Sequence, residues 1–352
     1  MLAVVGRSRP CFITASCHFI RLISTSADKS LLSKLRRTTG FTFAACKEAL
    51  IRHNNDFDKA VAWLNEEAVR RGWDKAGKVS NRALSHGLLG VLQHRSSAVI
   101  VEVNCETDFV ARNEQFQTFV ANLTETVMNR IQERLFTDHQ PAASNLAQYA
   151  PSEHDVAYVS DLPKVTWTAT ELNALVLPNA STVSDQTAVV IGSVGENMAV
   201  RRGLGWHVPN GSENASRLAA YTHVSTTGIR SGIRDVKFGK YASLIRYRPM
   251  GDQSSTPAWR ERAARLGKQL CQHIVGMNPR PGLEITEPNA NPEEEQCLLL
   301  QPFFLDENVR VGEHLMRNDM ILEDFIRVEC GQDDSTVTCG TKSPNADITS
   351  EN

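Results

Sequence analysis

The residues best suited to chemistry lie in the run Glu-Thr-Asp-Phe-Val at positions 106–110. An acid beside an aromatic ring could act as a proton-transfer group or as a recognition surface. A general acid or base needs a partner within hydrogen-bond reach, and neither Asp108 nor Asp324 has a visible one. The plainest interpretation makes Asp108 a helix cap and Phe109 a core residue, so the run is either a structural turn or a binding turn.

Recognisable catalytic and cofactor patterns are absent from the sequence. It contains no phosphate-binding Gly-x-x-x-x-Gly-Lys-Ser/Thr or Gly-x-Gly-x-x-Gly, no Gly-x-Ser-x-Gly and no His-Glu-x-x-His. The 8 cysteines form no Cys-x-x-Cys, and the 10 histidines form no metal-binding pair on a convincing helix. We therefore predict a protein that is not an enzyme and that uses no cofactor or metal.

Composition points to a globular chain with several packed units. Its 352 residues are 41% hydrophobic and 22% charged, enough for two or three cores. The net charge of −2 gives no general attraction to polyanions, so no direct nucleic-acid partner is expected. No apolar run reaches about 18 residues, and no membrane partner is expected.

The first 27 residues have the composition of a mitochondrial transit peptide. They contain Arg7, Arg9 and Arg21, several serines and threonines, and no acid before Asp28. These arginines interrupt the apolar stretch that a secretory signal would need. Import into the mitochondrial matrix is therefore predicted, with a disordered N-terminus as the alternative.

Residues 28–73 show apolar residues at helical spacing in three bursts, typical of a small three-helix module. Gly40 can end the first helix, and Thr42 and Asp56 can cap the second and third. A polar bridge is expected over 74–82. The spacing then alternates at 87–92 and 98–103, which predicts a β-hairpin, and a helix follows with Asn113 as its cap. The turn at 107–110 therefore lies between a strand and a helix.

The remaining pattern mixes strands and helices without regular alternation, which predicts an α+β fold. We expect two α+β core subdomains with small antiparallel sheets, at 84–206 and 207–331. The further expectations are a flexible insertion (137–165), helical structure interrupted at Pro178 (172–190), strands (198–202, 240–247, 325–330), a helix (259–276), a loop (284–296), a short element (315–321) and a disordered tail (332–352).

Residues 102–113, Glu-Val-Asn-Cys-Glu-Thr-Asp-Phe-Val-Ala-Arg-Asn, resemble the signature of the translation elongation factor Ts family. The resemblance covers about residues 30–331 and rests on several ordered motifs, which makes it more specific than any one of them. They are residues 32–50, 58–64, 195–198 (Gly-Glu-Asn-Met), 201–202, 221–223 (Tyr-Thr-His), 239–241, 272–279, 301–304 and 324–329.

The resemblance implies a nucleotide-exchange factor for elongation factor Tu, a GTPase that carries aminoacyl-tRNA. In this family the Thr-Asp-Phe-Val turn inserts into the GTPase and disturbs its magnesium and phosphate site. Phe109 would be the inserted ring, Asp108 would bind donors of the partner, and Thr107 and Val110 would shape the turn. Because Pro279 precedes only a short loop-like stretch before Gln301, the chain is similar to the mitochondrial branch, and the expected partner is mitochondrial elongation factor Tu.

Three further residues match family positions that contact the GTPase, and the match at each is weaker than at the turn. They are Arg36, Phe43 and His223. A solvated charge and a core aromatic are the plain interpretations of Arg36 and Phe43. After His223 the sequence departs from the family, because Val224 replaces a glycine and a long insertion precedes Gly239.

Three other functions are compatible with parts of the sequence. A ubiquitin-like-binding adaptor is the main alternative, because the three-helix module, with Gly40-Phe41 in its first loop, resembles ubiquitin-associated (UBA) domains. An enzyme using Asp108 or Asp324 and an RNA-binding protein are the others. The last is disfavoured because the chain lacks a basic, aromatic-rich stripe.

Overall fold

The computed structural model describes residues 26–39, 41–138, 164–208, 216–224, 229, 232–251, 256–283, 288–289, 291–332 and 338–339. The chain divides into two compact units, residues 1–68 and 69–352. The predicted transit peptide, insertion and tail lie mostly outside the described residues.

The first unit contains three helices in the predicted order. They are α1 (Lys29–Thr39), α2 (Phe43–Arg52) and the first half of α3 (Phe57–Val79). Thr42 accepts a hydrogen bond from the Ala45 amide at 3.4 Å and so caps α2 as predicted. The buried side chains of this unit come from all three helices: Leu32, Leu35, Cys46, Ala49, Leu50, Ala60 and Leu64.

Helix α3 continues through most of the stretch that was predicted to be a polar bridge. Residues 74–79 are helical, so the bridge is shorter than expected. The reason is apolar spacing that the polar composition concealed, because Ala76 and Val79 pack against the core of the second unit.

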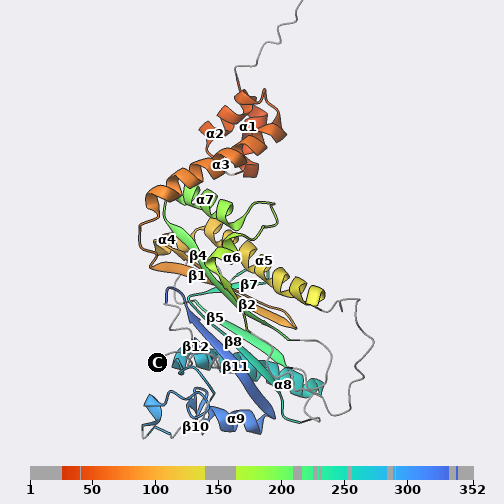
Figure 1. Ribbon diagram of the computed structural model, residues 1–352, viewed down its shortest axis with the longest axis vertical. Coiled ribbons are helices and arrows are strands. Elements are labelled where there is room, and N and C mark those ends of the chain that lie inside the picture. The colour runs from red at the N-terminus through yellow and green to blue at the C-terminus, as the bar shows by residue number, and fades with distance from the viewer. Residues whose placement is uncertain are drawn as a thin grey trace, which may run out of the picture. The chain divides into compact units, whose positions relative to one another are not determined.

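The first sheet of the second unit is antiparallel and has the strand order β3-β4-β2-β1-β7-β6 (Figure 1). The predicted hairpin is confirmed, since β1 and β2 pair from His86↔Cys105 to Gln93↔Ala98. The strands are β1 (His86–Gln93), β2 (Ser97–Cys105), β3 (Val165–Thr168), β4 (Met198–His207), β6 (Gly232–Ile233) and β7 (Val236–Gly239).

The second sheet has the order β12-β11-β8-β5, and β9 and β10 form a separate pair. Its strands are β5 (Arg217–His223), β8 (Tyr241–Pro249), β11 (Met320–Glu329) and β12 (Thr338–Cys339), and the separate pair is β9 (Pro302–Phe303) and β10 (Asp306–Arg310). The helices of this unit are α4 (Asp108–Arg112), α5 (Glu114–Asp138), α6 (Ala169–Asn173), α7 (Val183–Val194), α8 (Pro257–Met277) and α9 (Val311–Arg317), with a 3-10 turn at Pro292–Glu294.

Two expectations about the limits of these sheets need correction. Strands β6 and β7 follow residue 206, yet β7 pairs with β1 in the first sheet because Val236 and Phe238 are buried in that sheet's core. The first sheet therefore uses residues assigned to the second subdomain. Within the predicted disordered tail, Thr338–Cys339 pair with β11.

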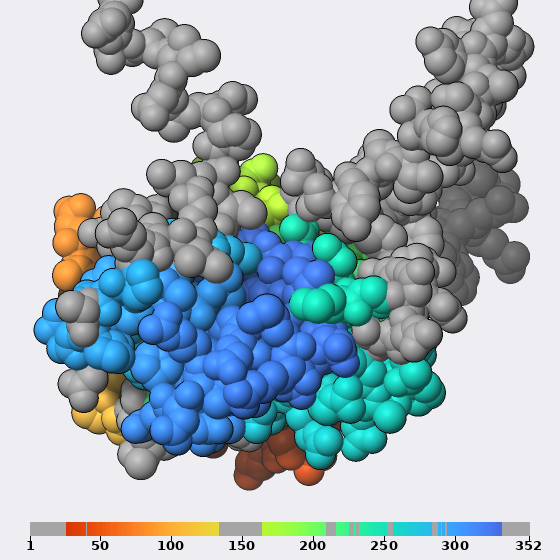
Figure 2. Space-filling view, turned by 90° about the horizontal axis from the view of Figure 1, so that it is seen from below, coloured from red at the N-terminus to blue at the C-terminus, as the bar shows by residue number. Residues whose placement is uncertain are grey.

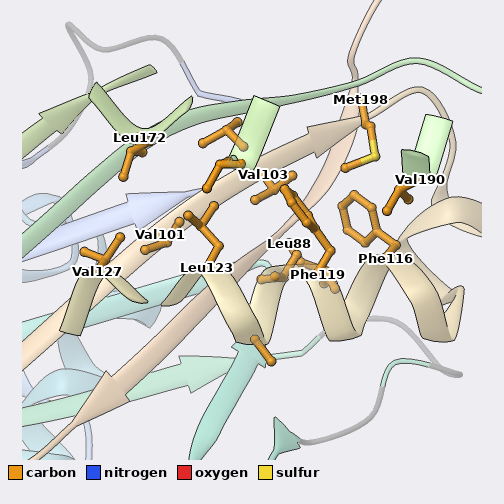
Figure 3. Packing of buried hydrophobic residues seen from close by; sticks show 14 of the residues in the cluster. Leu88, Val101, Val103, Phe116, Phe119, Leu123, Val127, Leu172, Val190 and Met198 are labelled. Atoms are coloured by element: carbon orange, nitrogen blue, oxygen red, sulfur yellow. The ribbon is translucent and has the colours of Figure 1, made fainter. Parts of the chain in front are cut away.

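Strands β1 and β2 are buried on both faces, which explains their nearly unbroken apolar sequence. On one face Leu88, Val101 and Val103 meet α5 through Phe116, Phe119, Leu123 and Val127 (Figure 3). On the other face Leu89, Val91 and Ile100 meet Leu244, Ile326 and Val328 of the second sheet. Helix α8 covers the far face of that second sheet.

His273 of α8 is buried in a neutral state, which makes stability depend on pH. Its Nδ1 accepts from the Phe304 amide at 3.4 Å, so its Nε2 donates to Gln301 Oε1 at 3.0 Å. Burial lowers the pKa of His273 to about 4 from 6.5. The pKa of His273 is therefore lower in the folded protein than in the unfolded chain. The stability that neutral His273 contributes is complete above pH 6.5 and is lost as the pH falls toward 4.

We expect the free energy of unfolding to drop by up to about 3 kcal/mol over this range because of His273. Denaturant unfolding at several pH values measures the loss. His273→Gln should remove most of this pH dependence, whereas His223→Gln, at an exposed site, should keep it. An unchanged pH profile in His273→Gln would contradict the assignment.

Candidate functional site

The turn at 107–110 starts a single helical turn on the end of a buried strand. Strand β2 ends at Cys105 and α4 begins at Asp108, with Thr107 as its N-cap in extended conformation. The Thr107 hydroxyl accepts from the Val110 amide at 3.4 Å and donates to Glu196 Oε2 at 2.7 Å. The cap residue is therefore fixed both to its own helix and to a second loop.

The second loop follows α7 and braces the turn through Glu106. Gly195 ends α7 with a φ of 85°, a left-handed conformation that suits glycine. Next to it, the Glu106 amide donates to the Asn197 carbonyl at 3.0 Å, and the Asn197 amide donates to Glu106 Oε2 at 3.1 Å. Arg82 also pairs with Glu106, at 3.3 Å. The backbone before Thr107 is held from two sides.

Phe109 projects from this braced base into solvent. Its side chain is 74% exposed, whereas the neighbouring Val110 is 4% exposed and Ala111 fully buried. Exposure of a large aromatic ring beside buried residues has a cost in water, and such rings often mark a contact surface. The interpretation of Phe109 as a core residue is wrong.

Asp108 is not the cap of α4 but pairs with a residue of the same helix. Thr107, not Asp108, accepts the capping hydrogen bond, so the cap interpretation of Asp108 is wrong. Its carboxylate pairs with Arg112 one turn later, and the Arg112 guanidinium carbon lies 5.8 Å from the centroid of the Phe109 ring. Arg112 therefore neutralises the acid and borders the exposed ring.

The weaker positions are also surface side chains. In the first unit, Arg36 is exposed and Phe43, the first residue of α2, is 56% exposed, so its interpretation as a core aromatic is wrong. In the second unit, His223 is exposed at the end of β5. Its ring centroid lies 6.5 Å from that of Tyr221 and 6.4 Å from that of Tyr241.

The site also contains residues whose positioning role sequence reasoning did not predict: Arg82, Glu106, Arg112, Glu196 and Asn197. Glu196 and Asn197 belong to the Gly-Glu-Asn-Met motif, yet nothing in their spacing reveals contact with a turn some ninety residues away along the chain. The described residues include no cluster of three or more His, Cys, Asp or Glu side chains able to hold a metal. No helix in the described ranges is long and apolar enough to span a membrane.

Comparison with known proteins matches most of the chain. Residues 14–74 match a family model described as elongation factor Ts, mitochondrial, N-terminal, and residues 106–283 match elongation factor TS. A protein named elongation factor Ts, mitochondrial, from Drosophila melanogaster is 36% identical, covering 91% of this chain and 93% of the relative. Proteins of the same name are similar in Xenopus laevis (35%, covering 89% of each chain) and Rattus norvegicus (34%, covering 88% and 86%).

Proposed function

The chain belongs to the elongation factor Ts family, and on this premise we propose that it is the guanine-nucleotide exchange factor for mitochondrial elongation factor Tu. The names of its relatives and the arginine-containing, acid-free start of the chain both support action in mitochondria, and we propose the matrix as the compartment. The factor makes and breaks no covalent bond. It binds the GTPase, promotes release of GDP and leaves when GTP enters, in support of translation elongation.

The observation that carries this proposal is the exposed Phe109 ring on a braced, buried base. The Phe109 ring inserts between elements of the GTPase near its nucleotide site. Magnesium there requires near-octahedral oxygen geometry, so small displacements of its surroundings weaken its hold on the nucleotide phosphates. Thr107 and Val110 hold in place the backbone that carries the Phe109 ring.

Asp108 would contribute to binding by leaving its ion pair with Arg112 and accepting hydrogen bonds from the GTPase instead. Its Arg112 pair is part-buried and within one helix, and such pairs contribute little net stability. Hydrogen-bond donors of the GTPase can therefore compete for the carboxylate at small cost. Release of Arg112 would at the same time uncover the side of the Phe109 ring that Arg112 borders.

We also propose that α1–α3 form a UBA-like module that supplies a further contact to the GTPase. Phe43 and Arg36 are exposed there, and a shallow hollow on α2 is lined by Ala44, Lys47, Glu48, Ile51 and Arg52. His223 would add a contact from β5.

An equilibrium measurement tests the exchange function. If the factor weakens GDP binding, GDP must weaken binding of the factor to the same extent. We expect the chain without its first 27 residues to bind nucleotide-free mitochondrial elongation factor Tu at least about tenfold more tightly than the GDP form, a coupling of about 1.4 kcal/mol. Calorimetry measures both affinities, and equal affinities would contradict the proposal.

A further inference from the structure

Three arginines converge on one place in the second unit. Arg95 lies in the turn between β1 and β2, Arg217 begins β5, and Arg260 lies near the start of α8. The Gln93 side chain donates to the Leu218 carbonyl at 2.8 Å, which fixes the hairpin end beside the start of β5. The Arg217 guanidinium carbon lies 5.8 Å from the ring centroid of Trp259, the residue before Arg260.

Among the residues that the structure describes, this place carries a net positive charge. Burial lowers the pKa of Arg217, and the charges of Arg260 and Arg95 lower it further. The Nε of Arg217 is buried without a hydrogen-bond partner. Among the described residues none of the three arginines forms an ion pair, whereas Arg82, Arg112, Arg202 and Arg248 all do. An unpaired, partly buried cation such as Arg217 is unfavourable unless a ligand neutralises it. Arg95 and Arg260 are exposed and add to the positive charge around it.

Helix α8 extends this positive surface. Its first turn contains no acid, although negative charge is what stabilises a helix N-terminus, and Arg260 lies beside that end. Arg262, Arg265 and Lys268 are exposed further along, and Glu261 is the helix's one acid. Elements of the C-terminal half, coloured teal to blue, form much of the coloured surface in Figure 2. From Arg260 to Lys268 the helix rises by about 12 Å, which suits a chain of anions better than a single ion.

We propose that Arg95, Arg217 and Arg260 bind the phosphate groups of an RNA backbone, which then crosses the exposed face of α8 past Lys268, Arg265 and Arg262. Guanidinium groups form paired hydrogen bonds to phosphate oxygens, and the Arg217 side chain as a whole is only partly buried. The net charge of −2 predicted no direct nucleic-acid partner, because an average over the chain conceals a local cluster. The proposed exchange function does not require this site.

The test measures binding of a labelled RNA hairpin to the chain without its first 27 residues, by fluorescence anisotropy at several salt concentrations. The double variant Arg95→Gln/Arg260→Gln should weaken RNA binding about tenfold. The slope of the logarithm of the association constant against the logarithm of the salt concentration should become less negative by about 2. The matched control is Arg130→Gln/Arg317→Gln. Like the test variant, it removes two positive charges, here from exposed arginines that each pair with a glutamate of the same helix. It should change RNA binding less than about twofold.

Three results of the binding experiment would overturn the proposal. They are absence of RNA binding by the unaltered chain at about 50 mM salt, equal weakening by both double variants, and tighter binding of an acidic peptide than of RNA at the same site. Inorganic phosphate, used as competitor, should displace the RNA only at far higher concentration. Release of GDP from elongation factor Tu is measured with the same variants. Unchanged release in Arg95→Gln/Arg260→Gln is expected, and a parallel loss would assign the arginines to the GTPase contact instead.

Discussion

Phe109→Ala is expected to slow factor-stimulated GDP release from mitochondrial elongation factor Tu by about thirtyfold or more. Buried aromatic anchors of an interface typically contribute about 2 kcal/mol or more, which corresponds to that factor in rate. The ring is 74% exposed in the free chain, so its removal leaves no cavity and the fold should persist. Rates are measured with fluorescent GDP, and unfolding by denaturant checks the fold.

Leu305→Ala provides a matched control for loss of an exposed apolar side chain. Leu305 lies between β9 and β10 and is 56% exposed. This variant should stimulate release nearly as well as the unaltered chain. If Phe109→Ala and Leu305→Ala had the same rates, Phe109 would have no role as the inserted ring, although the family assignment would stand.

Glu102→Gln is expected to lower the free energy of unfolding by about 3 kcal/mol. Glu102 is fully buried in β2 and accepts from Arg202 Nε at 2.7 Å and from the Gly331 amide at 2.7 Å. The carboxylate thereby links the first sheet to the segment after β11. Without its charge, the nearly buried Arg202 loses the acid that offsets its own desolvation.

The control for Glu102 is Glu313→Gln, which removes an exposed carboxylate paired with Arg317 within α9. This change should cost less than about 0.5 kcal/mol. Both values come from denaturant titrations followed by circular dichroism. A cost below about 1 kcal/mol for Glu102→Gln would show that the buried network contributes no more than a surface pair.

Local patterns were sufficient to predict much of this fold. The hairpin of β1 and β2, the helix after the turn and α8 all follow from apolar spacing that stays regular over many residues. Strands β6 and β7 were missed because they are short, and their pairing with β1 depends on partners far away in the chain. Residues 74–79 were assigned to a polar bridge because Ala76 and Val79 offer only a weak apolar signal.

The candidate site was predictable in part. Residues 107–110 were identified because they follow a predicted strand and belong to a family motif. The exposure of Phe109 could not be deduced from an isolated aromatic residue. Bonds from Thr107 to Glu196 and from Glu106 to Asn197 arise from the fold of the second unit. Sequence spacing alone does not encode such long-range braces.

The most direct test of the central claim is the rate of GDP release from mitochondrial elongation factor Tu in the presence of the unaltered chain. The GTPase is loaded with fluorescent GDP and mixed with excess unlabelled nucleotide and substoichiometric amounts of the chain. We predict a release rate that rises in proportion to the chain's concentration, with each molecule acting on many GTPase molecules. A rate equal to that of the GTPase alone at every concentration would contradict the account.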